Sequence, residues 1–212
     1  NHSVDAFSST LNWALRLVIL FGVPASIALI FLSEPMIAAL FYYGEMTERD
    51  VGMASSSLAA YGFGLLGHMM VKVLAPGYFA RQDMKTPVRF GVFALGANIF
   101  LNFALVWEFK HVGLAMATSL SAFLNASLLL FGLIRIEALR VESEWVLFLM
   151  KVSGASLFML FVLYIIIPDG SFWFTESLFL RITTLFVVCF AGALSYFAVL
   201  FCFGVRFKEL VR

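Results

Sequence analysis

Residues 47–80, TERDVGMASSSLAAYGFGLLGHMMVKVLAPGYFA, form the stretch of sequence that decides the fold. The stretch opens on Thr47, a good helix N-cap, and acidic Glu48 and Asp50 follow in what would be the first helical turn. At 1.5 Å per residue, some thirty residues make a helix of roughly 50 Å, longer than the hydrocarbon core of a bilayer at about 30 Å. We therefore expect a membrane-spanning helix that tilts, bends near Pro76 or protrudes from the bilayer.

The composition of the whole chain also indicates a protein that lies in a lipid bilayer. Of 212 residues, 62% are apolar and only 13% are charged, whereas a soluble domain is about a quarter charged. Five further segments are long and apolar enough to cross a bilayer, so we predict an all-α polytopic membrane helix bundle of about six transmembrane helices. We place the other spans at 11–32 (with a kink at Pro24), 86–107, 112–134, 145–167 and 177–203, and a half-helix at 36–41; Thr86 is expected to cap the helix that begins at 86.

Positive charges in the predicted loops fix an expected orientation. Eight cations fall on one side of the predicted bundle, and only Arg49 and Lys110, with Arg181 just inside a helix, fall on the other. Because cytoplasmic loops carry the excess of Lys and Arg, both termini are expected to be cytoplasmic, and the basic tail is expected to lie along the headgroups. The eight cations are Arg81, Lys85, Arg89, Arg135, Arg140, Arg206, Lys208 and Arg212.

A polar stripe runs along the predicted helix 47–80. At 100° per residue, its members fall within an arc of about 80°; they are Ser57, Tyr61, Gly64, His68 and Lys72. Polar side chains are costly inside a membrane, so they mark candidate functional positions. We interpret the stripe as the lining of a hydrated cavity that binds a polar, anionic group. The alternative is that Lys72 snorkels to the headgroups while the other residues pack against a neighbouring helix.

Two further groups of polar residues lie on two consecutive predicted helices. Asn98 and Asn102 lie one turn apart on the helix 86–107, and Thr118, Ser121 and Asn125 share one face of the next helix. Such residues in membranes commonly hydrogen-bond across helices. The alternative is an oxygen cage for a cation formed by Asn98, Asn102 and Thr118, although this set contains no carboxylate.

Several chemistries lack support in the sequence. No GxxxxGK[ST], HExxH or GxSxG motif occurs, so we predict a transporter and not an enzyme, with no cofactor and no firm metal site. The net charge of +1 gives no reason to expect nucleic-acid binding. Cys189 and Cys202 stand thirteen residues apart in one apolar run, about 20 Å along a helix, which is too far for a disulfide.

Three motifs give the chain a family resemblance. GEMTERD (44–50), KVLAPGYFARQDMKTPVR (72–89) and HVGLAMATSLSAFLNASLLL (111–130) are similar to the MurJ (MviN) family of lipid II flippases of the bacterial inner membrane. The resemblance implies a fourteen-span fold of which this chain would supply spans nine to fourteen. Residues 1–135 would then be four helices of the second transporter lobe, and residues 136–212 a C-terminal helix pair with a basic cytoplasmic tail.

The resemblance also implies partners. Lipid II, the lipid-linked peptidoglycan precursor, would be moved from the cytoplasmic to the outer leaflet by alternating access, with its head in a cavity and its polyprenyl tail in a groove of the C-terminal pair. The partners would be lipid II, membrane lipids and the missing N-terminal helices of the same protein. Some family members bind sodium in this lobe, and Asn98, Asn102 and Thr118 match that spacing, with Asn where an acidic ligand would be stronger.

Two other functions stay open from sequence. One is export of another polyprenyl-linked saccharide or of an amphipathic drug, because the architecture is shared. The other is a non-transporting membrane scaffold for cell-wall synthesis, which would tolerate neutralisation of Lys72.

Overall fold

A computed structural model describes residues 2–140 and 144–204 of the chain, and within these ranges it is all-helical. The basic tail with Arg206, Lys208 and Arg212 lies outside the described residues. The helices are α1 (His2–Phe31), α2 (Ser33–Phe41), α3 (Glu48–Phe79), α4 (Lys85–Arg135), α5 (Trp145–Ile166), α6 (Phe172–Thr175) and α7 (Leu178–Cys202). Five of them are long and apolar enough to cross a membrane.

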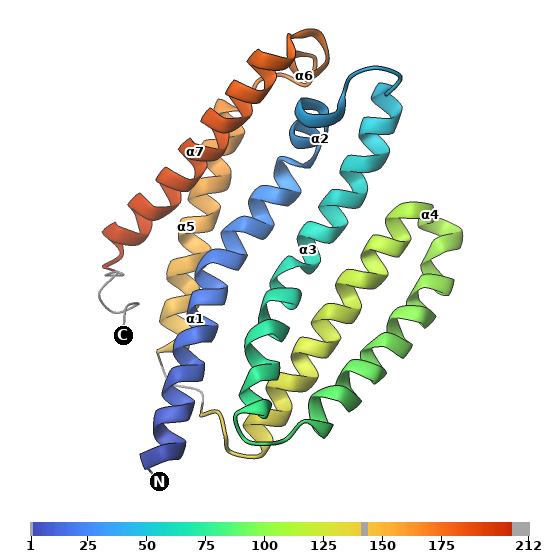
Figure 1. The fold of residues 1–212 in the computed structure, drawn as a ribbon. Helices are drawn as coiled ribbons and strands as arrows, with labels where there is room; N and C mark the ends of the chain where they lie inside the picture. Colours follow the sequence, from blue (N-terminus) through green and yellow to red (C-terminus); the bar gives the residue numbers. More distant parts are fainter. Residues whose placement is uncertain (1, 141–143, 205–212) are drawn as a thin grey trace.

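Helix α4 is a hairpin that supplies two of the six predicted spans. Its 51 residues are broken at Lys110, where φ is 50° and ψ is −125°, and the two arms run antiparallel (Figure 1). The break lies in the polar turn that the sequence predicted between 107 and 112. The expectation of six spans is therefore confirmed, with two of them joined by one tight turn.

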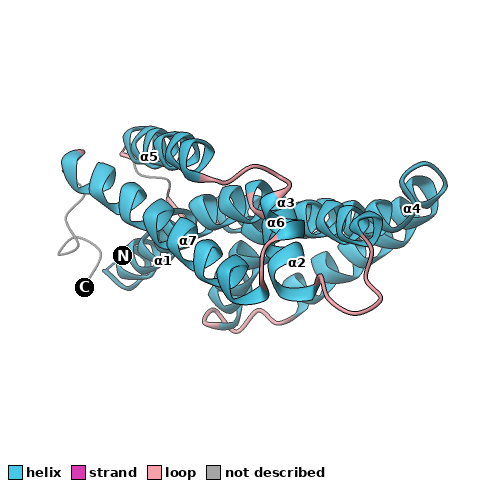
Figure 2. Ribbon diagram, turned by 90° about the horizontal axis from the view of Figure 1, so that it is seen from above, coloured by secondary structure: helices cyan, strands magenta, loops and turns pink. Residues whose placement is uncertain are grey.

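The helices form an elongated layer (Figures 1 and 2). The α4 hairpin lies at one edge, α3 packs between it and α1, and the pair α5 and α7 packs on the other side of α1. The start of α1 and the turns after α3 and α4 lie at one end of the bundle, which we call the near end. Helices α2 and α6 lie at the opposite, far end.

Outward faces of the bundle are strongly apolar, as expected for a chain solvated by lipid. Large side chains on several helices are more than two-thirds exposed, among them Phe100 at 72%, Trp107 at 83%, Phe179 at 80% and Phe186 at 72%. A water-soluble protein of this size rarely exposes such a surface. The chain is a multi-pass membrane protein.

Of the two helix caps predicted from the sequence, the structure confirms Thr47 and contradicts Thr86. Thr47 caps α3 as predicted: its Oγ1 accepts the Asp50 N–H at 3.3 Å, and Asp50 Oδ2 accepts the Thr47 N–H at 2.9 Å. The prediction that Thr86 caps the next helix is wrong. Asp83 Oδ1 accepts the N–H groups of Lys85 and Thr86 at 3.1 and 3.0 Å, because the helix begins one residue earlier than expected.

Helix α1 is longer than predicted at its N-terminal side. The apolar run begins at Leu11, but the helix starts at His2, because its first turns make polar contacts: Ser8 Oγ accepts the Arg140 N–H at 3.0 Å and Asp5 pairs with Arg140 at 3.1 Å. Asn12, only 2% exposed, donates to the Arg140 carbonyl at 2.9 Å and accepts the Trp145 indole N–H at 2.8 Å. Arg16 pairs with Glu144 at 3.3 Å. These contacts join the near ends of α1 and α5.

Candidate functional site

Helix α3 approaches its two neighbours closely through glycines. A Cβ on Gly62 would lie 3.1 Å from Ile30 of α1, and a Cβ on Gly64 would collide with the Ser119 side chain of α4. Ser119 is fully buried and donates to the Ala60 carbonyl of α3 at 2.6 Å. Small residues at such interfaces let helix backbones pack in a membrane. Gly64 therefore lies at a close approach between α3 and α4, on the side of α3 that faces α4.

The other members of the predicted stripe lie beside this contact. Tyr61 is 47% exposed, and His68 and Lys72 are also exposed. Ser57 is half-buried, and its hydroxyl donates within the helix to the Met53 carbonyl at 3.3 Å. Tyr61, His68 and Lys72 of the stripe are therefore exposed polar side chains that no other helix in the described part of the chain covers, and the buried Gly64 lies beside them.

Pro76 removes a backbone hydrogen-bond donor from the part of α3 that carries Lys72. Proline has no N–H, so the carbonyl four residues earlier, that of Lys72, receives no hydrogen bond from the helix. Pro76 and Lys72 are both exposed. In hydrocarbon a backbone carbonyl without a donor costs several kcal/mol, so this part of α3 requires water or another polar partner.

The asparagines form a hydrogen-bonded ladder between the arms of α4. Asn102 Nδ2 donates to Asn98 Oδ1 at 3.0 Å, and Asn98 Nδ2 donates to the Ser121 hydroxyl at 3.2 Å. The buried Oδ1 atoms of Asn102 and Asn125 have no hydrogen-bond partner among the described residues. The structure thus brings both predicted polar groups together as an interhelical contact.

The same atoms fit a resident cation poorly. Asn98 Oδ1 already accepts a hydrogen bond, and the Thr118 hydroxyl donates to the Leu114 carbonyl at 2.9 Å. Of the oxygens of Asn98, Asn102 and Thr118, Asn102 Oδ1 is the one that has no hydrogen-bond partner among the described residues. Hard cations are held by several oxygens, usually including carboxylates, and no cluster of three or more His, Cys, Asp or Glu side chains occurs in residues 2–140 and 144–204. A cation here would need a charged ligand from outside this chain.

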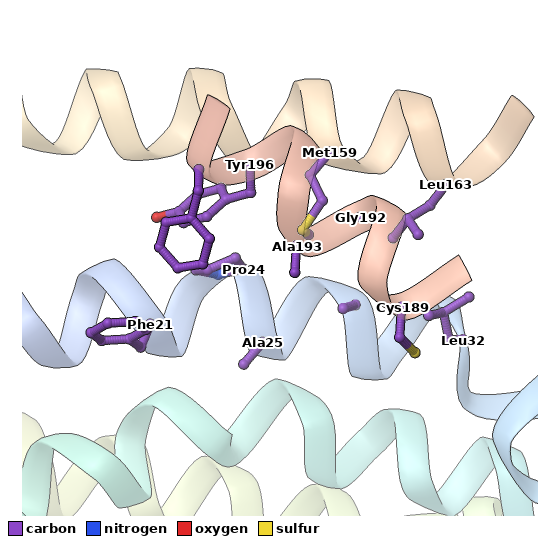
Figure 3. A pocket seen from close by; sticks show the side chains of 12 residues that line it. Phe21, Pro24, Ala25, Leu32, Met159, Leu163, Cys189, Gly192, Ala193 and Tyr196 are labelled. Carbon is purple, nitrogen blue, oxygen red and sulfur yellow. The ribbon is translucent and has the colours of Figure 1, made fainter. Parts of the chain in front are cut away.

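An apolar pocket lies between α1, α5 and α7 (Figure 3). Its volume is about 210 Å³, smaller than the roughly 300–1,000 Å³ of sites that enclose a whole drug-sized molecule. Helix α1 contributes Phe21, Pro24 and Ala25, α5 contributes Met159 and Leu163, and α7 contributes Cys189, Gly192, Ala193 and Tyr196. A lining this apolar suits a hydrocarbon chain and not a charged group.

Tyr196 holds this pocket together in a way that the sequence did not reveal. Pro24 removes the N–H that would bond the Leu20 carbonyl, and the Tyr196 hydroxyl of α7 donates to that carbonyl at 2.7 Å. Tyr196 is 1% exposed. The sequence signals that the Leu20 carbonyl is free, because Pro24 stands in the middle of a span. It does not signal which helix supplies the donor.

Comparison with known proteins gives one consistent result. A family model described as lipid II flippase MurJ matches residues 1–184. A probable lipid II flippase MurJ of Vibrio cholerae is 42% identical over 206 residues, which are 97% of this chain and 39% of that protein. The corresponding protein of Haemophilus influenzae is 38% identical over 205 residues, 97% of this chain and 40% of that protein.

A solved structure agrees with the sequence matches. It is described as a lipid II flippase MurJ in an inward closed conformation, and it matches with a TM-score of 0.78 at 28% identity over 97% of this chain and 40% of that chain. The chain therefore spans about two fifths of the length of the relatives that it matches.

Proposed function

The chain belongs to the lipid II flippase MurJ family, and on that premise we propose that the full-length protein moves lipid II from the cytoplasmic to the outer leaflet of a bacterial inner membrane. In this proposal residues 1–135 are four helices of the second transporter lobe, and residues 136–212 are a C-terminal pair with its tail. The near end of the bundle carries Arg81, Lys85, Arg135 and Arg140, so the positive-inside rule supports a cytoplasmic near end and cytoplasmic termini.

The observation that carries the proposal is the uncovered polar side of α3. Lys72 offers an ammonium group, His68 an imidazole and Tyr61 a phenol, and all three are exposed on a membrane-spanning helix. These groups can neutralise and hydrogen-bond a pyrophosphate, and the Lys72 carbonyl, which lacks an i+4 donor because of Pro76, adds an acceptor at the same place. We propose that they line the hydrated cleft that receives the lipid II head.

Transport would follow from rocking of two lobes around this cleft. The head stays hydrated between the lobes while the lipid tail stays in the bilayer, and the lobes then expose the cleft to the other side. The membrane potential acts on each moving charge with about 2.3 kcal/mol per 100 mV, which is enough to bias two states. No covalent chemistry is required of this chain, so we propose a transporter and not an enzyme.

We propose that the apolar pocket between α1, α5 and α7 contacts the polyprenyl tail. Its lining offers hydrocarbon surface from three helices, and the native Cys189 lies in that lining. Cys202 is also exposed, on the same helix but outside the pocket, so it provides a built-in control. In the full-length protein in lipid, added lipid II should slow alkylation of Cys189 by a membrane-soluble maleimide and leave the rate at Cys202 unchanged. Equal protection or none at both cysteines would remove the pocket from the proposal.

A charge substitution tests the cleft. Lys72→Ala in the full-length protein should strongly reduce lipid II export, measured as the fraction of lipid II in the outer leaflet. Lys85→Ala removes an exposed lysine at the start of α4 and should export at the wild-type rate. Wild-type export by Lys72→Ala would exclude Lys72 from the cleft.

Depletion of the full-length protein in cells distinguishes lipid II from the other candidate substrates. Depletion of the full-length protein should cause lipid II to accumulate. Accumulation of another polyprenyl-linked saccharide or of a drug would favour the broader exporter class. Suppose that the protein still supports growth when Lys72 is neutralised and Asn98 and Asn102 are replaced by apolar residues. That result would favour the scaffold function.

We propose that this transport needs no cofactor and no sodium ion. The Asn98, Asn102 and Thr118 oxygens are neutral, and Asn98 Oδ1 already accepts a hydrogen bond, so a cation would gain little from them without a further carboxylate. Export should therefore proceed equally with sodium and with potassium as the only monovalent metal ion. Loss of export on removal of sodium would show that another part of the protein completes a cation site.

A further inference from the structure

Arg181 is a charged side chain buried in an apolar part of the molecule. It lies one turn into α7 and is 7% exposed. Its Nη1 lies within hydrogen-bond distance of three carbonyls: those of Ala38 at 3.1 Å, Tyr42 at 3.2 Å and Trp173 at 3.2 Å. One guanidinium group from α7 therefore contacts α2, the residue that ends α2, and α6.

The chemistry of these partners explains why a cation is placed here. The last carbonyls of a helix carry partial negative charge, and α2 has no basic residue in its own last turn. The Ala38 carbonyl also accepts the Tyr42 N–H at 3.2 Å, so Arg181 is a second donor there. The Arg181 guanidinium also lies 5.5 Å from the centre of the Tyr42 ring, a favourable cation–π distance. No carboxylate forms an ion pair with Arg181 in the described parts of the chain. The end of α2 thus takes the place of a counter-ion.

Buried apolar residues surround this contact. We call them the far-end cluster: Ala38, Ala39, Val51, Trp173 and Leu185. The cluster joins α2 and α3, which follow α1 in the proposed lobe, to α6 and α7 of the C-terminal pair. Removal of the cation would take a donor from the Tyr42 and Trp173 carbonyls, which is costly away from water, whereas the Ala38 carbonyl would keep the Tyr42 N–H at 3.2 Å.

The C-terminal pair is also held at two other levels. At the near end the Trp145 indole of α5 donates to Asn12 of α1 at 2.8 Å, and midway along α1 the Tyr196 hydroxyl donates to the Leu20 carbonyl at 2.7 Å. Each contact uses a buried polar partner. The pair is therefore attached to α1 and α2 at both ends and in the middle of the bundle.

We propose that Arg181 is a positioning residue that anchors the C-terminal helix pair to α2, so that the pair and the second lobe move as one rigid body. The pocket between α1, α5 and α7 then keeps its width while the two lobes rock, and motion occurs at surfaces outside this chain. The anchor consists of the contacts of Arg181 with the carbonyls of Ala38, Tyr42 and Trp173. Its consequence for export rests on the proposed function.

A disulfide across the far-end cluster tests rigid-body motion without altering Arg181. In full-length protein with both native cysteines replaced by Ser, the changes Ala39→Cys and Leu185→Cys place one thiol on α2 and one on α7. We expect the disulfide to form on oxidation and the oxidised protein to export lipid II at the rate of the reduced protein. Export that stops on oxidation and returns on reduction would overturn the proposal. A reduced protein that also fails to export would instead contradict the proposed function.

Hydrogen exchange tests Arg181 directly, with no transport assay. Arg181→Met keeps an apolar stem but donates nothing, and amides of α6 and the first turns of α7 should exchange about 10- to 100-fold faster, since one hydrogen bond to a charged group is worth at least about tenfold. Arg181→Lys restores the charge and should recover most of the protection. Arg140→Met, at a mostly exposed arginine at the near end, should leave these amides unchanged. Equal exchange in the Met variant and wild type, or a Lys variant no better than Met, would exclude the anchor.

Discussion

The hydrogen bond from Tyr196 to the Leu20 carbonyl leads to a quantitative prediction. Tyr196→Phe keeps the ring and removes the donor, and the Leu20 carbonyl then has no hydrogen bond because Pro24 supplies no N–H. An unsatisfied buried acceptor costs about 1–3 kcal/mol, and hydrogen bonds between membrane helices are measured at about 0.6–2 kcal/mol. We therefore expect the substitution to lower the free energy of unfolding by about 1–2 kcal/mol.

The proline supplies a second half to the test. In a Pro24→Ala background the backbone N–H of residue 24 can bond the Leu20 carbonyl, as in an ordinary helix turn. The same Tyr196→Phe change should then cost less than about 0.5 kcal/mol, which gives a coupling of about 1 kcal/mol between two positions on different helices. Pro24→Ala alone changes helix propensity, but that contribution cancels in the cycle.

Unfolding of the full-length protein in mixed detergent micelles would provide the four free energies. Tyr164→Phe serves as the matched control, because Tyr164 is 71% exposed on α5, and it should change the free energy by less than about 0.5 kcal/mol. An equal cost of Tyr196→Phe with proline and with alanine at position 24 would refute the reasoning, since the Leu20 carbonyl would then not depend on the tyrosine.

Three further predictions concern single positions. Lys110→Gly should raise the free energy of unfolding by about 0.5–1 kcal/mol, because the turn has a positive φ that glycine adopts without strain, whereas Lys110→Val should lower it. Gly64→Val should lower the free energy of unfolding by about 1–3 kcal/mol, measured in the same unfolding assay, because the larger side chain forces α3 away from Ser119. Hydrogen bonds from the Thr86 hydroxyl and backbone hold the pKa of Asp83 below its ordinary value. Asp83 therefore contributes stability above the unfolded-state pKa of about 3.9, and this contribution is lost as pH falls through the lower folded pKa; Asp83→Asn should remove that acid dependence from the unfolding midpoint.

The sequence predicts the spans well because each of them is set by local chemistry. Apolar run length, the Thr47 cap and the polar turn at Lys110 depend on residues close together in the chain, and all three are found in the structure. The short helix α6 was not predicted, since four residues between two turns carry no periodic pattern. Helix α1 was predicted too short, because its first turns are stabilised by contacts of Asp5 and Ser8 with Arg140, more than a hundred residues away.

The candidate site shows the same division between local and distant information. Helical spacing placed Tyr61, His68 and Lys72 on one side of α3, and all three are exposed there. The sequence assigned Arg181 only to the edge of a span, yet its buried position depends on carbonyls of α2 and α6. Charge patterns locate such a residue along the membrane normal, but only packing shows what it contacts.

The most direct measurement is the water accessibility of the two sides of α3. Tyr61 and Phe63 are 47% and 53% exposed and lie two residues apart, so they point to nearly opposite sides of one helix. In the full-length protein lacking its native cysteines, we expect a membrane-impermeant maleimide to label Cys at position 61, and likewise at 68 and 72, while Cys at position 63 stays unlabelled in lipid. Equal protection of positions 61 and 63 would contradict a hydrated cleft on α3.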